Sequence, residues 1–263
     1  MDLGLEGKVA LVTAASEGLG FACAQRLAKA TCKMAICGRR PDVLAAAREK
    51  LLKDGAGDVL AVPTDLADSG AIDDLVKRAL AHFGSLDILV MNSGHIAYGG
   101  LEDLTEMQWE HAHNLLLMSA VRLARLCVPA MRVNKGGDIV FLGSATTREP
   151  PPHLLLSTVM RLGVAGLAKT LARSLAPDNI RVNLIAPGYF DTGRVHKRVR
   201  EMMIEKNLSQ VEAENQVSGG LPIGRIGSAE ELAELVAFVV SRKAGFMTGA
   251  TISIDGGGGR TLF

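Results

Sequence analysis

The feature that most constrains this chain is an alternation of short apolar runs with segments of helical periodicity along almost all of its 263 residues. Such alternation is typical of a parallel sheet whose two faces are covered by helices. Seven apolar runs bounded by Gly, Pro, Asp or Asn are expected as strands, at residues 8–13, 33–37, 58–62, 86–91, 138–142, 180–185 and 251–254. The sequence therefore predicts an α/β fold, with one domain over residues 1–263 and a doubly wound, seven-stranded parallel sheet.

Helical periodicity fills the gaps between these runs. The expected helices are 19–30, 41–53, 69–83, a long one within 107–133, another within 155–176, and 229–241. Pro41 suits a first helical turn, and Ser228 with Glu231 three residues later forms a capping box. The charged stretch 189–222 has no strand pattern, and it is expected to be either a mobile helical flap over a pocket or a fixed surface insertion.

Composition narrows the classes of partner. Only 4% of residues are aromatic, so stacking platforms for single-stranded nucleic acid are scarce, and 29 basic against 28 acidic residues leave a formal charge of +1. We expect no nucleic-acid partner. The N-terminus lacks a basic region followed by an apolar one, and no apolar stretch approaches the roughly 20 residues that span a bilayer. We therefore expect no membrane association and a cytoplasmic location.

The cysteines and histidines give no sign of a metal site. Cys23, Cys32, Cys37 and Cys127 show no C-x-x-C spacing, and we interpret them as small core residues. His111 and His113 stand two apart on an expected helix and so face different directions. No metal is expected.

A glycine-containing loop, TAASEGLG at residues 13–20, joins the first expected strand to the first expected helix. A strand, loop and helix in this order aim free backbone N–H groups and the positive helix end at a pyrophosphate, and Gly18 and Gly20 permit its close approach. The sequence therefore predicts a Rossmann-type dinucleotide site.

The end of the second expected strand favours NADP over NAD as that dinucleotide. An acidic residue there would bind a free ribose 2′-hydroxyl, and Gly38 supplies none. Arg39 can pair with a 2′-phosphate, although Glu17 beside the pyrophosphate loop acts in the opposite direction. The alternative is that Arg39 and Arg40 form only a solvated turn.

With these residues in hand, the chain resembles the short-chain dehydrogenase/reductase family, which includes 3-oxoacyl-carrier-protein reductases and sugar or polyol dehydrogenases. The loop is similar to the family's T-G-x-x-x-G-x-G, with Ala14 in place of the first glycine, which a negative φ would tolerate. Further matches are TDL at 64–66, NSG at 92–94, NIRVN at 179–183 and DGG at 255–257. The resemblance implies an NAD(P)-dependent oxidoreductase acting on a small carbonyl or alcohol, 3-oxoacyl or similar, assembled as a homotetramer through its two long helices.

The resemblance also implies the residues of the site. Its cofactor-binding positions are Thr13, Ser16, Gly18, Leu19, Gly20, Arg39, Asp65, Leu66, Asn92, Gly94, Pro187, Gly188 and Thr192. Its catalytic positions are Asn114, the substrate-orienting Ser144, and the Tyr-x-x-x-Lys pair, where this chain has Ser157 and Arg161.

Ser157 and Arg161 change the chemistry that the resemblance implies. In the family the tyrosine exchanges a proton with the substrate oxygen, whereas an aliphatic hydroxyl is a far weaker acid and lacks the ring. Losing general acid–base help costs about 10² to 10⁴ in rate. Arg161 can bind ribose hydroxyls or lie partly exposed on its helix. Two functions stay open: a reductase with another proton donor, and a dinucleotide-binding sensor or partner subunit with little turnover.

Other groups near the expected pocket are candidates for that donor. Tyr189, His153 and His95 can each reach a substrate oxygen, or instead form a pocket wall or flap hinge. Prolines 150–152 either narrow the substrate wall or stop the chain before the next helix, and leucines 154–156 suit either an apolar substrate or core packing.

Overall fold

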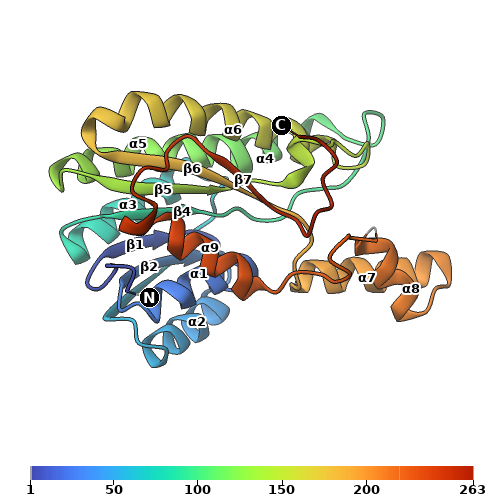
Figure 1. Ribbon diagram of the computed structural model, residues 1–263, viewed down its shortest axis with the longest axis horizontal. Helices are drawn as coiled ribbons and strands as arrows, with labels where there is room; N and C mark the ends of the chain where they lie inside the picture. Colours follow the sequence, from blue (N-terminus) through green and yellow to red (C-terminus); the bar gives the residue numbers. More distant parts are fainter. Residues whose placement is uncertain (1, 219, 263) are drawn as a thin grey trace.

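The central sheet has seven parallel strands in the order β3-β2-β1-β4-β5-β6-β7 (Figure 1). The computed structural model describes residues 2–218 and 220–262. The strands are β1 (Val9–Val12), β2 (Lys33–Gly38), β3 (Asp58–Pro63), β4 (Ile88–Met91), β5 (Gly137–Leu142), β6 (Ile180–Pro187) and β7 (Thr251–Ile254). The α/β class, the Rossmann fold with helices on both faces, and the single domain are confirmed.

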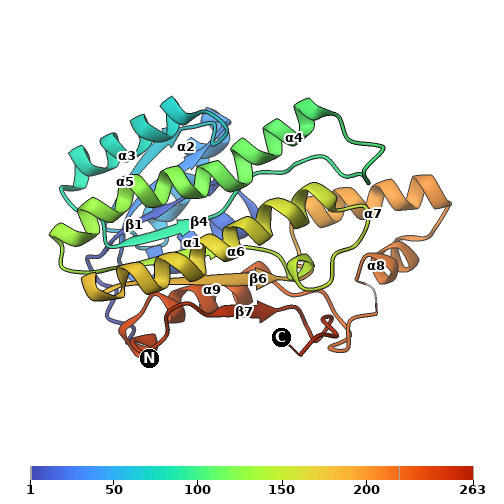
Figure 2. The same cartoon turned by 90° about the horizontal axis from the view of Figure 1, so that it is seen from above.

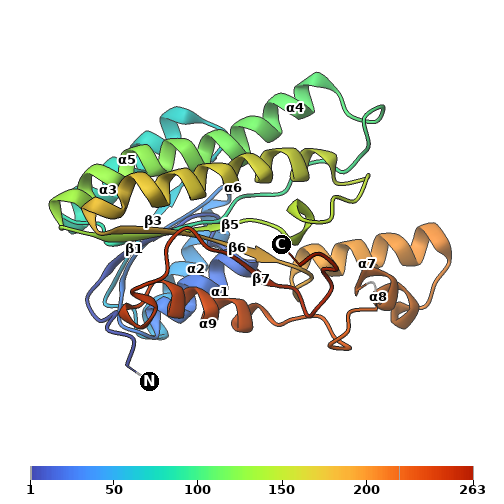
Figure 3. The same ribbon diagram turned by 45° about the horizontal axis from the view of Figure 1, so that its top comes forward.

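Two helical layers cover the sheet (Figure 3). On one face lie α1 (Gly18–Ala28), α2 (Pro41–Lys53) and α9 (Ala229–Val239). On the other lie α3 (Ser69–Phe83), α4 (Glu106–Ala112), α5 (Ser119–Val133) and α6 (Leu155–Leu175). Each interface holds its own aliphatic core. β1 and β4, at the centre, are buried at every residue, because apolar side chains point into both layers.

Local signals in the sequence fix several element ends. Pro41 begins α2, and Ser228 accepts a hydrogen bond from the Glu231 N–H while the Glu231 carboxylate accepts one from the Ser228 N–H. The capping box is confirmed. The four cysteines are free and buried, as small core residues should be.

The long helix over residues 106–133 contains one irregular turn that the sequence pattern did not predict. Its centre, His113–Met118, is a turn of π-helix between α4 and α5, and it contains Asn114. Wider turns of this kind occur mostly at functional sites.

The expectation that no apolar segment is long enough to span a bilayer is wrong by length and composition. Two helices, Glu106–Val133 and Leu155–Asp178, are long and apolar enough. This is weak evidence for a membrane, since the core helices of soluble proteins pass the same test. Both helices pack against the sheet and lie side by side (Figures 2 and 3).

Within the stretch 189–222 lie two helices, α7 (Gly193–Lys206) and α8 (Gln210–Ser218), which project beyond one end of the sheet (Figure 1). They share a small apolar cluster, Val199, Met202, Ala213 and Val217, which is separate from the two main cores. At their base Phe190 pairs with Gly227, and the Asp191 N–H donates to the Gly227 carbonyl at 2.8 Å. The pair of helices is therefore packed as a unit of its own.

The glycine loop differs from expectation at Ala14. Its φ is +46°, in the left-handed region, so the assumption of a negative φ is wrong. Its carbonyl accepts a hydrogen bond from the Asn92 side chain at 3.3 Å, and a Cβ on Gly20 would collide with that same carbonyl. The loop is closed tightly enough that Ala14 is strained and Gly20 cannot carry a side chain.

Replacing Ala14 by glycine should raise the free energy of unfolding by about 0.5–1 kcal/mol, because relief of left-handed strain exceeds the added chain entropy. Urea unfolding followed by circular dichroism measures the change. Ala15→Gly, at a fully buried neighbour outside the left-handed region, is the control and should lower stability. If Ala14→Gly is as destabilising as this control, the strain is absent.

Candidate active site

A cavity of about 1160 Å³ opens at the carboxyl ends of the strands. It lies where the strand order reverses between β1 and β4, which is where open parallel sheets bind ligands. The predicted residues that line it are Ser16, Gly18, Leu19, Arg39, Asp65, Leu66, Asn92, Gly94, Ser144, Ser157, Arg161, Pro187, Gly188 and Thr192. Thr13, Gly20 and Asn114 do not line it.

Thr13 and Gly20 shape the cavity from behind. The Thr13 hydroxyl is buried, donates to the Asn92 carbonyl at 2.6 Å and accepts from the Asn92 N–H at 3.0 Å. This pair ties the end of β1 to the end of β4. A side chain on Gly20 would strike both the Ala14 carbonyl and the Asn92 amide. Both residues therefore position the glycine loop and Asn92.

The end of β2 has no side chain at Gly38 and is followed by two arginines beside the cavity. A Cβ on Gly38 would lie 2.9 Å from the Ser16 hydroxyl oxygen, so glycine allows the loop to pack closely here. Glu17, which was expected to oppose a bound phosphate, forms an ion pair with Arg40 at 2.8 Å. Arg39 is exposed and lines the cavity. The pair of arginines thus keeps a net positive charge beside the site.

Asp65 and Ser144 stand in turns at the strand ends. The Asp65 carboxylate accepts from the Ala67 N–H at 3.0 Å, which places Leu66, a buried residue, against the cavity. The Ser144 oxygen accepts from the N–H and the hydroxyl of Thr146, at 3.2 and 2.9 Å. These contacts fix the orientation of the Ser144 side chain at the cavity wall.

Asn114 lies away from the cavity lining. Its side-chain oxygen accepts a hydrogen bond from Arg122 at 3.3 Å, inside the turn of π-helix. The structure therefore does not bring the Asn114 side chain together with Ser144 and Ser157.

Arg161 crosslinks three elements around Ser157. Its guanidinium donates to the carbonyls of Leu142 and Gly143 at 2.8 and 2.9 Å, to the Ser157 hydroxyl at 3.3 Å and to the Ser93 hydroxyl at 3.4 Å. The end of β5, the loop after β4 and the start of α6 are thereby held together. Ser157 is only 7% exposed. Its hydroxyl is engaged by a cation that does not deprotonate at neutral pH.

Arg161→Met should lower the free energy of unfolding by about 2 kcal/mol, because two backbone carbonyls lose a charged donor. Lys169→Met, on the same helix with one exposed hydrogen bond to Gly249, is the matched control and should cost about 0.5 kcal/mol or less. Urea unfolding of both variants checks the difference. Equal stabilities would show that Arg161 does not hold these elements together.

The structure adds cavity residues that sequence reasoning did not single out. Tyr98 lines the cavity between His95 and His153, and Arg198 reaches it from α7. Arg198 also approaches Glu201 and Glu205 of its own helix at 3.4 Å each. The spacing of Tyr98, four residues after the NSG turn, is a signal that could have found it. No signal in the sequence places Arg198, because its position depends on how α7 folds back.

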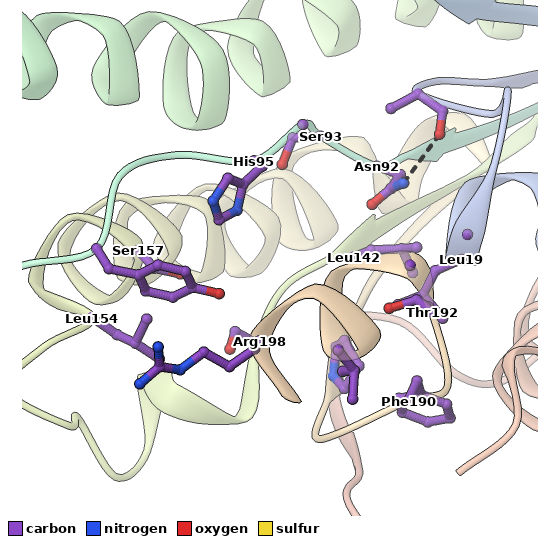
Figure 4. Close-up of a pocket in the computed structure, with 18 of the residues that line it drawn as sticks. Leu19, Asn92, Ser93, His95, Leu142, Leu154, Ser157, Phe190, Thr192 and Arg198 are labelled. Carbon is purple, nitrogen blue, oxygen red and sulfur yellow. Dashed lines mark hydrogen bonds between the residues drawn. The ribbon is translucent and has the colours of Figure 1, made fainter. Parts of the chain in front are cut away.

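The cavity has two ends (Figure 4). Asn92, Leu142, Leu19 and Thr192 surround the end nearest the glycine loop, and His95, Ser157, Leu154 and Arg198 surround the other. Of the three leucines at 154–156, Leu154 faces the cavity and Leu156 belongs to the core. Core packing is confirmed for Leu156, and Leu154 adds an apolar surface to the cavity wall.

A Rossmann-type sheet with a glycine loop and a large cavity at its switch point defines a dinucleotide-binding protein. Over residues 13–258 the chain matches the family described as Enoyl-(Acyl carrier protein) reductase. It is 34% identical over 257 residues to human Dehydrogenase/reductase SDR family member 4, covering 96% of this chain and 88% of that protein. It is 28% identical over 256 residues to NADPH-dependent reductase BacG of Bacillus subtilis (strain 168), covering 97% and 99%.

A solved structure agrees with these relatives. L-sorbose reductase from Gluconobacter frateurii, complexed with NADPH and L-sorbose, superposes with a TM-score of 0.96 at 33% identity, and 100% of both chains is covered. The chain belongs to the short-chain dehydrogenase/reductase family. It is an NAD(P)-dependent oxidoreductase, and the comparisons do not support a sensor or partner subunit without turnover.

Proposed function

We propose that this protein is an NADPH-dependent reductase of a small carbonyl compound, with NAD(H) as the weaker cofactor. The observation that carries the proposal is one continuous cavity, which runs from the glycine loop and Arg39 to Ser144 and Ser157. A dinucleotide at the first end places its redox ring near the second. The relatives named above include proteins described as NADPH-dependent or as complexed with NADPH.

The residues present fit this cofactor. A Cβ on Gly20 or Gly38 would collide with atoms of the glycine loop, so glycine at both positions lets the loop pack closely. The N-terminus of α1 faces the cavity. We assign the pyrophosphate to the backbone of residues 16–20 and the 2′-phosphate to Arg39. We assign the adenine to Asp65 and Leu66, and the nicotinamide half to Asn92, Gly94, Pro187, Gly188 and Thr192. When bound, the cofactor supplies the hydride.

The substrate end then needs three actions from this chain. Ser144, oriented by Thr146, is placed to donate a hydrogen bond to the substrate oxygen. Arg161 keeps a positive charge beside Ser157, where charge develops on that oxygen. The 189–222 segment acts as a flap, since α7 and α8 share their own apolar cluster and Arg198 lines the cavity from α7. A substrate with a polar group fits that end of the cavity, where Arg198 shares its charge with Glu201 and Glu205.

We further propose a homotetramer in the cytoplasm. Val133 on α5 and Val159 and Leu162 on α6 are 81%, 43% and 48% exposed, on the helices that the family resemblance assigns to assembly. Burial of such side chains favours association. Four unpaired buried thiols suit a reducing compartment.

Arg39→Ala should weaken NADPH binding at least about tenfold, because a charge-assisted contact to the 2′-phosphate is lost. NADH affinity should stay nearly unchanged, because NADH lacks that phosphate. Arg40→Ala is the matched control, since Arg40 pairs with Glu17. Fluorescence titration with both cofactors measures the effect. Equal loss of NADPH and NADH affinity in Arg39→Ala would remove Arg39 from the 2′-phosphate site.

Steady-state assays test the proposed function directly. The purified protein should bind NADPH with a change in its fluorescence, and should oxidise NADPH with at least one member of a panel of ketones, oxoacyl thioesters and sugars. Binding without oxidation across the panel would overturn the reductase proposal. Absence of binding would overturn the cofactor assignment as well.

A further inference from the structure

Reduction of a carbonyl requires a proton donor at the substrate oxygen, and the position that supplies it elsewhere in the family holds Ser157. Ser157 and Ser144 are aliphatic alcohols, and the guanidinium of Arg161 does not release its proton at neutral pH. A donor has to come from another titratable group that faces the same end of the cavity.

Three titratable rings form a cluster at that end. The Tyr98 ring lies 5.1 Å from the His95 ring and 6.5 Å from the His153 ring, measured between centroids, and all three residues line the cavity. Tyr98 is the middle member. It is 38% exposed, so the cluster meets both the cavity and solvent.

The backbone fixes this cluster beside Ser157. The Gly99 N–H donates to the His153 carbonyl at 2.9 Å, and Gly99 forms a bridge with Leu154. His153 lies two residues before α6 begins at Leu155, and Ser157 is in the first turn of that helix. The residue next to Tyr98 is therefore bonded to the turn that presents Ser157.

The other end of the same loop is held to the same helix. Arg161 of α6 donates both to Ser93, five residues before Tyr98, and to Ser157. Gly99 has a φ of +156°, and a Cβ there would lie 2.9 Å from the Asp103 Cβ, so the loop turns sharply just after Tyr98. Figure 4 shows the His95 ring directed toward the side of the cavity where Ser157 lies.

We propose that Tyr98 is the proton donor of this enzyme, and that its phenol, carried by the loop after β4, replaces the tyrosine that α6 lacks at position 157. This inference rests on the proposed reductase function. A phenol is a stronger acid than the aliphatic alcohol at position 157, and a serine there is too small to fill the space that a ring would occupy.

The proton and electrons balance in this scheme. As the carbonyl carbon receives a hydride, the π electrons of the C=O bond move to its oxygen, which takes the proton of the Tyr98 hydroxyl. His95 or His153 returns a proton to the tyrosinate and regains one from solvent. One NADPH is oxidised, one carbonyl is reduced to an alcohol, and one solvent proton is consumed.

The chain provides a matched control, because its only two tyrosines, Tyr98 and Tyr189, both line the cavity. Tyr98→Phe removes one hydroxyl and keeps the ring between the histidines. It should lower kcat about 100-fold or more, with KM, NADPH affinity and Tm close to wild type. Tyr189→Phe tests the other cavity tyrosine, and a larger loss of kcat there than in Tyr98→Phe would overturn the assignment.

A second measurement guards against a misfolded variant. Fluorotyrosine, a more acidic phenol, incorporated into the Tyr189→Phe background replaces Tyr98 alone, and it should shift the alkaline limb of the kcat profile to lower pH. A Tyr98→Phe variant with more than half of wild-type kcat, or an unshifted profile, overturns this inference alone. Wild-type protein that reduces no carbonyl overturns the proposed function and this inference together.

Discussion

The hydrogen-bonded pair between Thr13 and Asn92 is the contact on which the site depends. It joins β1 to β4 where the strand order reverses, so it sets the width of the crevice between the two halves of the sheet. Asn92 also holds the Ala14 carbonyl, which fixes the glycine loop on one side, and it begins the loop that carries Tyr98 on the other. A buried hydroxyl thus aligns the proposed cofactor end with the proposed substrate end.

Arg161 makes more hydrogen bonds around Ser157 than a lysine at the same position could make. A lysine offers a point charge, whereas the fork of a guanidinium reaches two carbonyls and two hydroxyls at once. Arg161 therefore strengthens the framework around position 157, and its contact with Ser93 draws the loop after β4 toward α6. Under the proposed function, the same guanidinium ties the loop that bears Tyr98 to the helix that bears Ser157.

The sequence predicted those features that depend on residues close together in the chain. Apolar runs located all seven strands, and Pro41 and the Ser228–Glu231 box fixed helix starts, because these signals act within one turn. Sequence patterns did not predict local conformations that depend on contacts between distant parts of the chain. The left-handed Ala14 is set by packing against α1 and Asn92, and the turn of π-helix by the long helix as a whole. Thr13 and Gly20 were found as motif positions, but only the structure shows that they act from behind the cavity lining. Tyr98 was passed over because the Gly99–Leu154 bridge, which joins its loop to the start of α6, links segments more than fifty residues apart.

The two ends of the cavity are built from parts of unequal rigidity. The glycine loop and Asn92 follow strands that are buried at every residue, and Arg161 of α6 is hydrogen-bonded to the end of β5. In contrast, α7 and α8 pack mainly on each other and connect to the sheet through the Phe190–Gly227 bridge. Side chains on α7 can therefore change, or move, with little effect on the hydrogen bonds that hold the cofactor end. Under the proposed function, hydride and proton transfer belong to the sheet edge and substrate choice belongs to the α7–α8 unit, from which Arg198 reaches the cavity. Proteins that share this sheet can then reduce different compounds by altering a unit whose packing is independent of the core.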